Sequence, residues 1–228
     1  MIMKNKYAIR SRISEKKFRE IIKCFAIDLN ATQTASMTGL SRKTINNYFQ
    51  KIREKIAEFC EKKSAKFFDE IEGDESYFGG KHSGKRGRGS ENKIAVAGLL
   101  ERGGKIFTKI VKKCDRKTLH KFIVQNVKKS STIFTDKWRG YDGLIDIGYQ
   151  KHFRIDHGKK EFARGKNHIN GIEGFWGLAK MRLVKFRGVQ REKFYFHLKE
   201  CEFRFNFRGE NLYVILLKIL RKSWLKLS

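Results

Sequence analysis

The spacing of apolar residues changes its period near residue 65, and this change constrains the fold more than any other feature of the chain. Before it, apolar side chains recur every three to four residues, as they do along amphipathic helices. After it come short segments rich in aromatic and aliphatic residues, separated by glycine-containing stretches, which is typical of strands and turns. From about residue 168 the helical period returns. We therefore expect an all-helical domain over 1–65 and a second domain over 66–228 that combines a sheet with helices.

The second region predicts a defined order of strands and helices. Three strands are expected at 66–78, 92–100 and 105–112, the last two joined by a glycine-containing turn. A helix, a strand, a short helix, a strand and further helices should follow, at 116–129, 131–135, 141–147, 150–155 and from 168 onward. Three antiparallel strands followed by crossover helices and parallel strands form the RNase H-like arrangement. The fold class predicted is α/β, with a mixed sheet covered by helices.

The first region has the outline of a helix-turn-helix. Residues 14–27 predict a helix capped by Ser14, and a longer helix is expected to follow a turn at Gly39 and a cap at Ser41. The start of this longer helix carries side chains that suit phosphates and base edges of DNA: Arg42, Lys43, Thr44, Asn46, Asn47 and Lys51. A three-helix cap with a purely structural role is the alternative.

The chain is strongly basic, with 52 Lys and Arg against 24 Asp and Glu and a formal net charge of +28. Such an excess repels itself unless it meets a polyanion, and nucleic acid is the usual one; a membrane surface is the weaker alternative. The apolar runs are far shorter than the roughly 20 residues that span a bilayer, and the N-terminal residues lack the apolar stretch of a signal peptide. We expect a cytoplasmic protein that binds nucleic acid and no membrane.

Acidic residues gather at one place in this basic chain. Five of the seven residues from Asp69 to Glu75 are acidic. Because a strand alternates its faces, Glu70, Glu72 and Asp74 should point the same way. Carboxylates packed like this repel one another unless they face solvent, pair with basic side chains or hold a hard cation. Charge pairing is the alternative for most of them, whereas Asp74, beside a glycine-rich loop, is the best candidate for a site.

Two more carboxylates complete a candidate metal site. Asp136 directly follows the strand predicted at 131–135, and the carboxyl end of a buried strand opens into a cleft in α/β sheets. Glu173 lies on the helix predicted from 168, where Asn170 and Lys180 share its face. Oxygen ligands from separate elements suit Mg²⁺ or Mn²⁺, and two such ions can activate a water or a 3′-hydroxyl and stabilise the leaving oxygen.

Three motifs resemble the catalytic blocks of DDE-type bacterial insertion-sequence transposases. They are GDESYFGG at 73–80, TDKWRGY at 135–141 and HINGIEGFWGLAK at 168–180. The compact ISXO-type family, with its RNase H-like catalytic domain, is the most similar, and the resemblance covers about residues 66–208. Many members carry a zinc ribbon near the N-terminus. The four cysteines of this chain are far apart and lack the C-x-x-C spacing of such a site.

This resemblance implies an activity and the roles of the site residues. Asp74, Asp136 and Glu173 would hold two Mg²⁺ (or Mn²⁺) ions, and Lys180 would steady a phosphate. The protein would cleave DNA at the element ends, and the freed 3′-hydroxyl would then attack target DNA without a covalent protein–DNA intermediate. Its partners would be double-stranded DNA (terminal repeats and target) and further copies of the chain, as a homodimer or a higher oligomer, at the bacterial nucleoid.

Other residues are expected to have supporting roles. Asn170 and His168 would lie behind the metal ligands or contact DNA. Basic residues near the acidic motifs should contact the DNA backbone: Lys85, Arg86, Arg88, Lys137 and Arg139. Glu72 and Glu202, by contrast, are expected only to balance surface charge and to be dispensable.

Two alternatives to a transposase stay open. One is a non-enzymatic, domesticated DNA-binding protein, against which the three intact acids argue. The other is a stand-alone RNase H-like metal nuclease, against which the helix-turn-helix argues. The segment GGKHSGKR at 79–86 resembles a phosphate-binding loop, but it ends in Arg where Mg²⁺ binding needs Ser or Thr, so a nucleotide site is not expected there.

Overall fold

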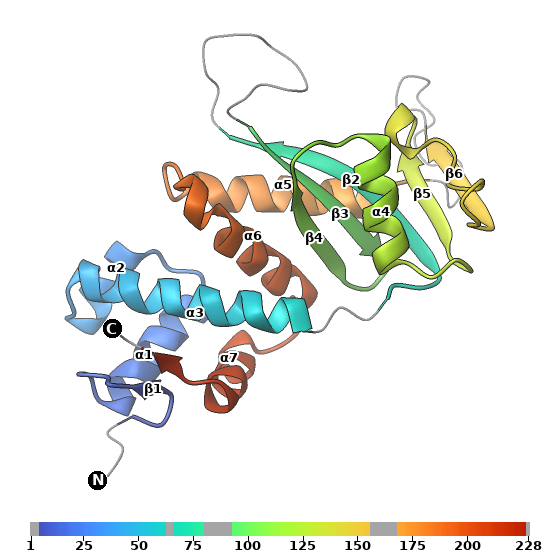
Figure 1. Cartoon of the computed structure of the whole chain (residues 1–228). Coiled ribbons are helices and arrows are strands. Elements are labelled where there is room, and N and C mark those ends of the chain that lie inside the picture. The colour runs from blue at the N-terminus through green and yellow to red at the C-terminus, as the bar shows by residue number, and fades with distance from the viewer. Residues whose placement is uncertain (1–4, 63–65, 80–92, 156–167, 227–228) are drawn as a thin grey trace. The chain divides into compact units, whose positions relative to one another are not determined.

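The computed structural model describes residues 5–62, 66–79, 93–155 and 168–226 (Figure 1). The chain divides into two compact units: unit 1 contains residues 1–63 and 185–228, and unit 2 contains residues 64–184. The boundary near residue 65 is where the apolar period changes. The segment 185–228, which the sequence assigned to the domain with the sheet, groups instead with the N-terminal helices.

Unit 1 is helical apart from one short pair of strands. Its helices are α1 (Glu15–Ala26), α2 (Ala31–Thr38), α3 (Arg42–Lys62), α6 (Arg191–Asn206) and α7 (Leu212–Lys222). The strands β1 (Ala8–Ile9) and β7 (Leu225–Lys226) pair in parallel. The core is made by both segments of the chain, because Phe203, Leu216 and Leu220 of the C-terminal helices pack with Phe18 and Ile52 of the N-terminal ones. This shared apolar cluster is the reason that the C-terminal helices belong to unit 1.

The helix ends of unit 1 follow the local chemistry of the sequence. The Ser14 side chain accepts a hydrogen bond from the Lys17 N–H and so caps α1, as predicted. Asn30 and Gln33 form a reciprocal capping box at the start of α2. Gly39 ends α2 with a φ of 68°, a left-handed conformation that glycine adopts without strain. The Ser41 hydroxyl accepts from the Thr44 N–H at the start of α3.

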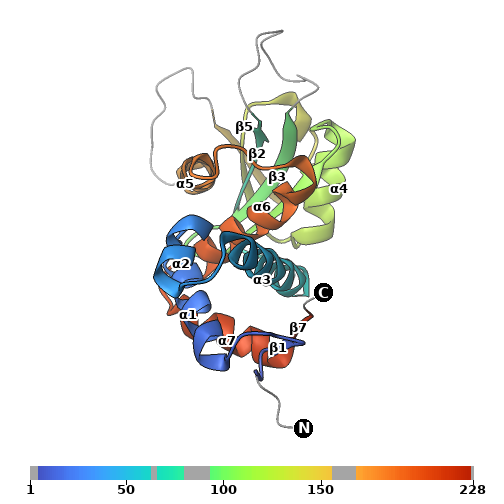
Figure 2. The same ribbon diagram turned by 90° about the vertical axis from the view of Figure 1, so that its left-hand side faces the viewer.

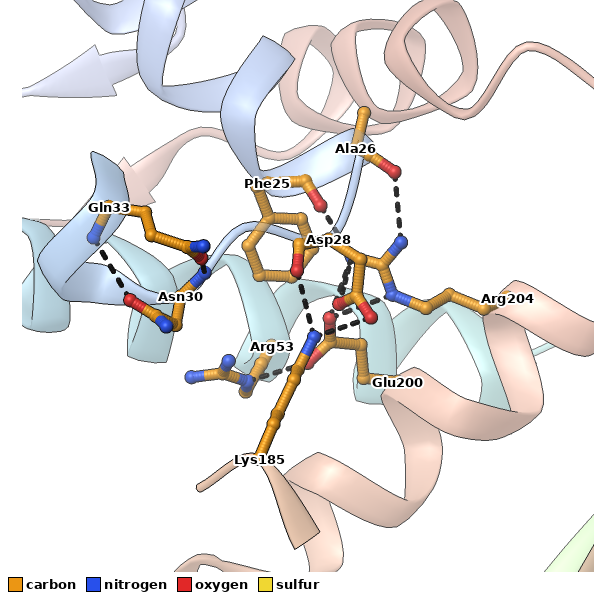
Figure 3. Close-up of polar contacts among 9 residues, drawn as sticks. All are labelled: Phe25, Ala26, Asp28, Asn30, Gln33, Arg53, Lys185, Glu200 and Arg204. Carbon is orange, nitrogen blue, oxygen red and sulfur yellow. Dashed lines mark hydrogen bonds and ion pairs between the residues drawn. The ribbon is translucent and has the colours of Figure 1, made fainter. Parts of the chain in front are cut away.

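A network of ion pairs, most of its groups largely buried, connects the helices of unit 1 (Figure 3). The carboxylate of Glu200, which is 1% exposed, accepts from Arg53 Nε at 2.7 Å and from Arg204 Nε at 2.9 Å. Arg204 also donates to the carbonyl oxygens of Phe25 and Ala26, at the end of α1. Glu200 therefore compensates the guanidinium groups of Arg53 on α3 and Arg204 on α6, and Arg204 pairs in addition with the carboxylate of Asp28 at 3.3 Å.

Unit 2 contains a five-stranded sheet in the order β4-β3-β2-β5-β6. Its strands are β2 (Glu70–Phe78), β3 (Ile94–Glu101), β4 (Ile106–Val111), β5 (Thr132–Asp136) and β6 (Lys151–Ile155). The pairs β2–β3 and β3–β4 are antiparallel, whereas β2–β5 and β5–β6 are parallel. The mixed sheet and its RNase H-like order are thus confirmed.

One helix covers each face of this sheet. Figure 2 shows α4 (Arg116–Asn126) and α5 (Asn170–Val184) on opposite sides of the strands. The α4 face carries the main apolar core, which includes Ile71, Leu119, Ile133 and Tyr141. The sheet is therefore buried on both faces, as expected for parallel strands at its centre.

Two elements differ from the sequence expectation because of backbone conformation. The strand expected at 66–78 begins only at Glu70, because Asp69 has a φ of 74° and cannot continue a strand. The helix expected at 141–147 is reduced to a single 3₁₀ turn, η1 (Arg139–Tyr141). Gly143 and Gly148, with φ values of 81° and 94°, replace the remainder of that helix by turns.

None of the helices in the described ranges combines the length and the apolar character that a membrane span requires.

Replacing Glu200 with Gln should destabilise unit 1 strongly, because the largely buried guanidinium group of Arg53 would lose its counter-charge and that of Arg204 would keep only the half-exposed carboxylate of Asp28. We expect the free energy of unfolding to fall by about 3–5 kcal/mol. Urea denaturation followed by far-ultraviolet circular dichroism measures this change. Glu210, which is exposed, provides the control, and Glu210→Gln should leave the transition unchanged. Equal transitions for the two variants would show that the network contributes no stability.

Candidate active site

The structure places Asp74 and Asp136 side by side on the two central parallel strands. Gly73 of β2 pairs with Thr135 of β5, so the next residues, Asp74 and Asp136, follow one register step later on the same face of the sheet. The charge of Asp136 is one of the causes that raise the pKa of Asp74, as expected for two carboxylates on neighbouring strands. Asp136 Oδ1 also accepts a hydrogen bond from the Trp138 N–H at 3.0 Å. Two of the three predicted metal ligands are thus brought together.

Helix α5 lies against the face that carries Asp74. Trp176 of α5 donates its indole N–H to Asp74 Oδ2 at 3.1 Å. Gly98 of β3 is the register partner of Asp74, and a Cβ atom there would lie 2.6 Å from the Trp176 ring. The absence of a side chain at position 98 therefore leaves the space in which the indole reaches Asp74.

Glu173 and Lys180 stand on the same helix on either side of Trp176. Glu173 lies three residues before Trp176, in the first turn of α5, and is exposed. Lys180 lies four residues after Trp176; it too is exposed, with its Nζ 5.8 Å from the centre of the Phe78 ring. The i, i+3 and i+4 spacings keep all three side chains on adjacent positions of one helix surface.

Glu72 has a structural role that the sequence did not predict. Its Oε2 accepts the backbone N–H of Ile172 at 2.9 Å, and its Oε1 accepts from Arg102 Nε at 3.1 Å. Glu72 is 1% exposed, so the expectation of a dispensable surface acid is wrong for it. The same expectation is wrong for Glu202, which is 2% exposed and bound to Lys199 Nζ at 3.0 Å. Both carboxylates are buried and compensated, and Glu72 holds the first turn of α5 to the sheet.

The neighbouring acid Glu75 points to the other face of the sheet. Its Oε2 accepts the hydroxyl proton of Tyr141 at 2.9 Å, and both residues are buried. Burial, and after it the charge of Glu75, raises the pKa of Tyr141, so the phenol stays protonated. The alternation predicted along this strand is confirmed, because Glu72 and Asp74 face α5 whereas Glu75 faces Tyr141.

Asp74 is the acid whose charge is least well accommodated. Burial raises its pKa to about 7, and the charges of Glu75 and then Asp136 act in the same direction. Ionisation of a carboxylate next to other carboxylates is unfavourable, and a bound divalent cation would stabilise the ionised form. The donor set therefore fits a hard cation. Within the described ranges, however, no three His, Cys, Asp or Glu side chains are arranged closely enough to hold a metal ion.

The supporting residues lie in different surroundings. Asn170 is the exposed first residue of α5. His168 approaches Glu72, with Nδ1 3.6 Å from Oε1, and its carbonyl oxygen accepts from Arg102. Lys137 and Arg139 are exposed and directly follow the strand that ends in Asp136. The predicted DNA-contacting residues Lys85, Arg86 and Arg88 lie outside the described residues.

The DNA-contacting side chains predicted on unit 1 fall into two groups. Four of them are exposed and make no hydrogen bond or ion pair with any side chain that the structure describes: Arg42, Lys43, Asn46 and Asn47. The other two are engaged, because Thr44 takes part in the cap with Ser41 and Lys51 pairs with Glu54 at 2.9 Å. The first two turns of α3 therefore present the cations and amides that remain available to a ligand.

The strand order and the paired acids at its centre define an RNase H-like domain with an acidic site. The chain belongs to the family of the ISXO2-like transposase domain, whose sequence profile matches residues 66–206. The chain is thus an insertion-sequence transposase by family.

Two curated proteins and a group of solved structures are similar to the chain. An uncharacterized transposase-like protein of Haemophilus influenzae is 41% identical over 119 residues, which are 52% of this chain and 95% of that protein. An uncharacterized protein in transposable element ISH50 of Halobacterium salinarum is 29% identical over 122 residues, which are 52% of this chain and 42% of that protein. The Mos1 strand transfer complex has a TM-score of 0.32 and 10% identity, covering 94% of this chain and 80% of the Mos1 chain.

Sequence reasoning missed Trp176, Glu72 and Tyr141 as partners of the acidic site. Gly98, which leaves room for the Trp176 ring, was visible in the sequence. That Gly98 lies opposite Asp74, however, can be known only from the register of the sheet. Glu72 and Asp74 were correctly placed on one face. What distinguishes them is the position of α5, about 100 residues further along the chain.

Asp74→Asn should change how the stability of the metal-free protein depends on pH. Between pH values near 3.8 and 7 the folded wild type keeps a proton on Asp74 that the unfolded chain has released, so its stability falls as the pH rises through this window. Asparagine does not titrate. The stability of the variant relative to the wild type should therefore increase by about 4 kcal/mol between pH values below 3.8 and above 7.

Urea denaturation in the presence of a chelator, at several pH values, measures the difference between the two proteins. Burial, and then the charge of Arg154, lowers the pKa of His152 to about 4 and gives a pH dependence of opposite sign. This contribution is common to both proteins and cancels in the difference. A difference that does not vary between pH 4 and 8 would contradict the perturbed titration of Asp74.

Proposed function

We propose that this transposase cleaves DNA at the ends of its element and joins the freed 3′-hydroxyl to target DNA. The observation that carries the proposal is the pair of interacting carboxylates, Asp74 and Asp136, on the central strands beneath α5. The family match over residues 66–206 includes every element that contributes to this site. Phosphoryl transfer at such a site consists mainly of positioning and charge stabilisation, which fixed carboxylates and cations can supply.

Asp74, Asp136 and Glu173 are the residues that would hold two Mg²⁺ or Mn²⁺ ions. Bound ions of this kind supply activation of a water or a 3′-hydroxyl and stabilisation of the leaving oxygen. Trp176 fixes one oxygen of Asp74 and thereby orients the carboxylate. Exposed Lys180 can bind a phosphate of the DNA, and exposed Asn170 can contact the DNA beside it.

A covalent protein–DNA intermediate is not part of the proposal. Tyr141, the tyrosine whose hydroxyl reaches the acids of β2, is 2% exposed and donates its hydroxyl proton to Glu75. Its raised pKa keeps it a poor nucleophile. The attacking groups are therefore water and the DNA 3′-hydroxyl.

Unit 1 would recognise the element ends through α2 and α3. These helices are joined by a short turn at Gly39, and the exposed side chains of the first turns of α3 suit the major groove. Because two ends must be joined to one target, the active assembly would contain at least two copies of the chain. Its place of action would be the bacterial nucleoid.

Asp74→Asn, Asp136→Asn and Glu173→Gln should each abolish the chemistry, because each removes charge from the cation site while conserving size. We expect cleavage and strand transfer to fall at least about 100-fold, since even partners of metal ligands contribute 10- to 100-fold. Incubation with Mg²⁺ and labelled element-end DNA, with detection of the nick that leaves a 3′-hydroxyl and of joined products, measures both steps. End binding should stay near wild type.

Asp69→Asn is the matched control for these variants. Asp69 is exposed in unit 2 and has a left-handed backbone that asparagine also tolerates. The Asp69→Asn variant should cleave end DNA as the wild type does. Full activity of Glu173→Gln would remove Glu173 from the site, and nicking without joined products would favour a nuclease over a transposase.

Asn46→Ala and Asn47→Ala should relax the preference for end DNA, because exposed amides on α3 would read base edges. Removing one base-reading amide should reduce the difference in binding free energy between end DNA and an unrelated duplex by about 1–3 kcal/mol. Competition binding between end DNA and an unrelated duplex measures the effect. Arg42→Ala is the comparison, since removal of a phosphate-binding cation should weaken binding to both duplexes equally. Unchanged discrimination in both asparagine variants would show that another element reads the ends.

A further inference from the structure

A groove of about 760 Å³ lies in unit 1 between the start of α3 and the segment Lys185–Gln190. One wall carries Arg42 and Asn46 of α3, and the start of α2 lies beside them. The other wall is formed by the segment that leads into α6, with Arg187 and Lys193. The described residues that line the groove include five Lys or Arg side chains and no Asp or Glu. Its lining is therefore suited to an anion.

The groove is held in place by the ion-pair network of unit 1 (Figure 3). Lys185 Nζ bonds to the carbonyl oxygen of Asp28 at 2.8 Å and pairs with its carboxylate, which fixes the start of the segment beside the α1–α2 turn. Arg53 lies in the groove lining and is compensated by Glu200. Lys185 and Arg53 are therefore already paired with acidic residues of unit 1.

The other three cations of the groove are available to a ligand. Arg42, Arg187 and Lys193 are exposed, and their side chains form no ion pair with any described residue. They stand on both walls, at the start of α3 and on the opposite segment. A ligand that compensates all three must carry several negative charges along its length, which a nucleic-acid backbone does.

The backbone of the segment supports a role for Arg187. Its φ of 50° is in the left-handed region, which residues other than Gly, Asn and Asp rarely adopt, and Gly188 follows with a φ of 110°. Strained conformations that persist in a folded protein occur preferentially at functional positions. Here the left-handed turn lies in the stretch of chain that forms the second wall of the groove.

We infer that this groove binds the sugar–phosphate backbone of double-stranded DNA, with Arg187 and Lys193 contacting phosphates on the flank of α3. The amides of Asn30 and Gln190, which also line the groove, can donate to phosphate oxygens. The inference rests on the proposed recognition of DNA by α3 and adds a second contact surface from the chain that directly follows α5. This surface contributes affinity for any duplex and no sequence preference.

The test uses the full-length protein with Arg187→Asn and Lys193→Ala. Asparagine is chosen because it tolerates a left-handed backbone and removes the charge. Fluorescence anisotropy with end DNA and with an unrelated duplex, over a series of salt concentrations, gives the slope of log affinity against log salt. Each variant should lower that slope by about 0.9, the contribution of one phosphate contact, and weaken both duplexes to the same extent.

The matched controls are Arg221→Ala and Arg187→Lys. Arg221 is an exposed cation of unit 1 on α7 that does not line the groove, so its removal should leave the slope unchanged. Arg187→Lys keeps the charge and should retain the slope. Thermal melting of each variant at the wild-type temperature shows that the fold is intact.

The outcomes separate this inference from the proposed function. If Arg187→Asn and Lys193→Ala bind as Arg221→Ala does, while Asn46→Ala loses its preference for end DNA, the groove inference is overturned and recognition by α3 stands. If the wild type binds no duplex, both are overturned. Replacing single phosphates of the duplex with neutral methylphosphonates gives a second readout. A methylphosphonate at the phosphate that Arg187 contacts should weaken binding of the wild type but should not weaken binding of Arg187→Asn further.

Discussion

The close approach of α5 to the sheet is the constraint on which the acidic site depends. Two positions without a Cβ atom make it possible: a side chain at Gly98 would collide with Trp176, and one at Gly171 would lie 2.6 Å from Leu100. The bond from the Ile172 N–H to Glu72 then fixes the first turn of the helix against β2. Because Glu173 follows directly, this backbone contact helps to set its position relative to Asp74.

The acids of β2 differ in how their charge is compensated. Glu72 has Arg102 and a backbone N–H, and Glu75 has the hydroxyl of Tyr141. Asp74 has one indole N–H and is surrounded by further negative charge, which is why its pKa is raised to about 7. The acids on both sides of Asp74 thus have fixed hydrogen-bond partners, and Glu72 has a guanidinium counter-charge as well. The unfavourable energy that remains is concentrated on the one carboxylate that an external cation could relieve.

Local chemistry predicted most of the elements, because helix period, caps and turn glycines act within a few residues. The order of strands also followed from the order of elements along the chain. Three kinds of information were not local. Whether the C-terminal helices belong to unit 1 or to unit 2 depends on which apolar surface Phe203 and Leu216 pack against. The turns that replace the helix expected at 141–147 depend on the backbone dihedrals of Gly143 and Gly148. The distinction between Glu72 and Asp74 depends on where α5 lies.

Unit 1 is built from two segments of the chain that are separated by the whole of unit 2. This arrangement sets an order of events during synthesis. Helix α3, which carries Arg42 and Asn46, leaves the ribosome early, but Phe203 and Leu220, which complete the core around it, are translated only after the sheet. The sheet unit can therefore close while the helical unit still lacks part of its core, so a nascent chain acquires its acidic site before its complete helical unit.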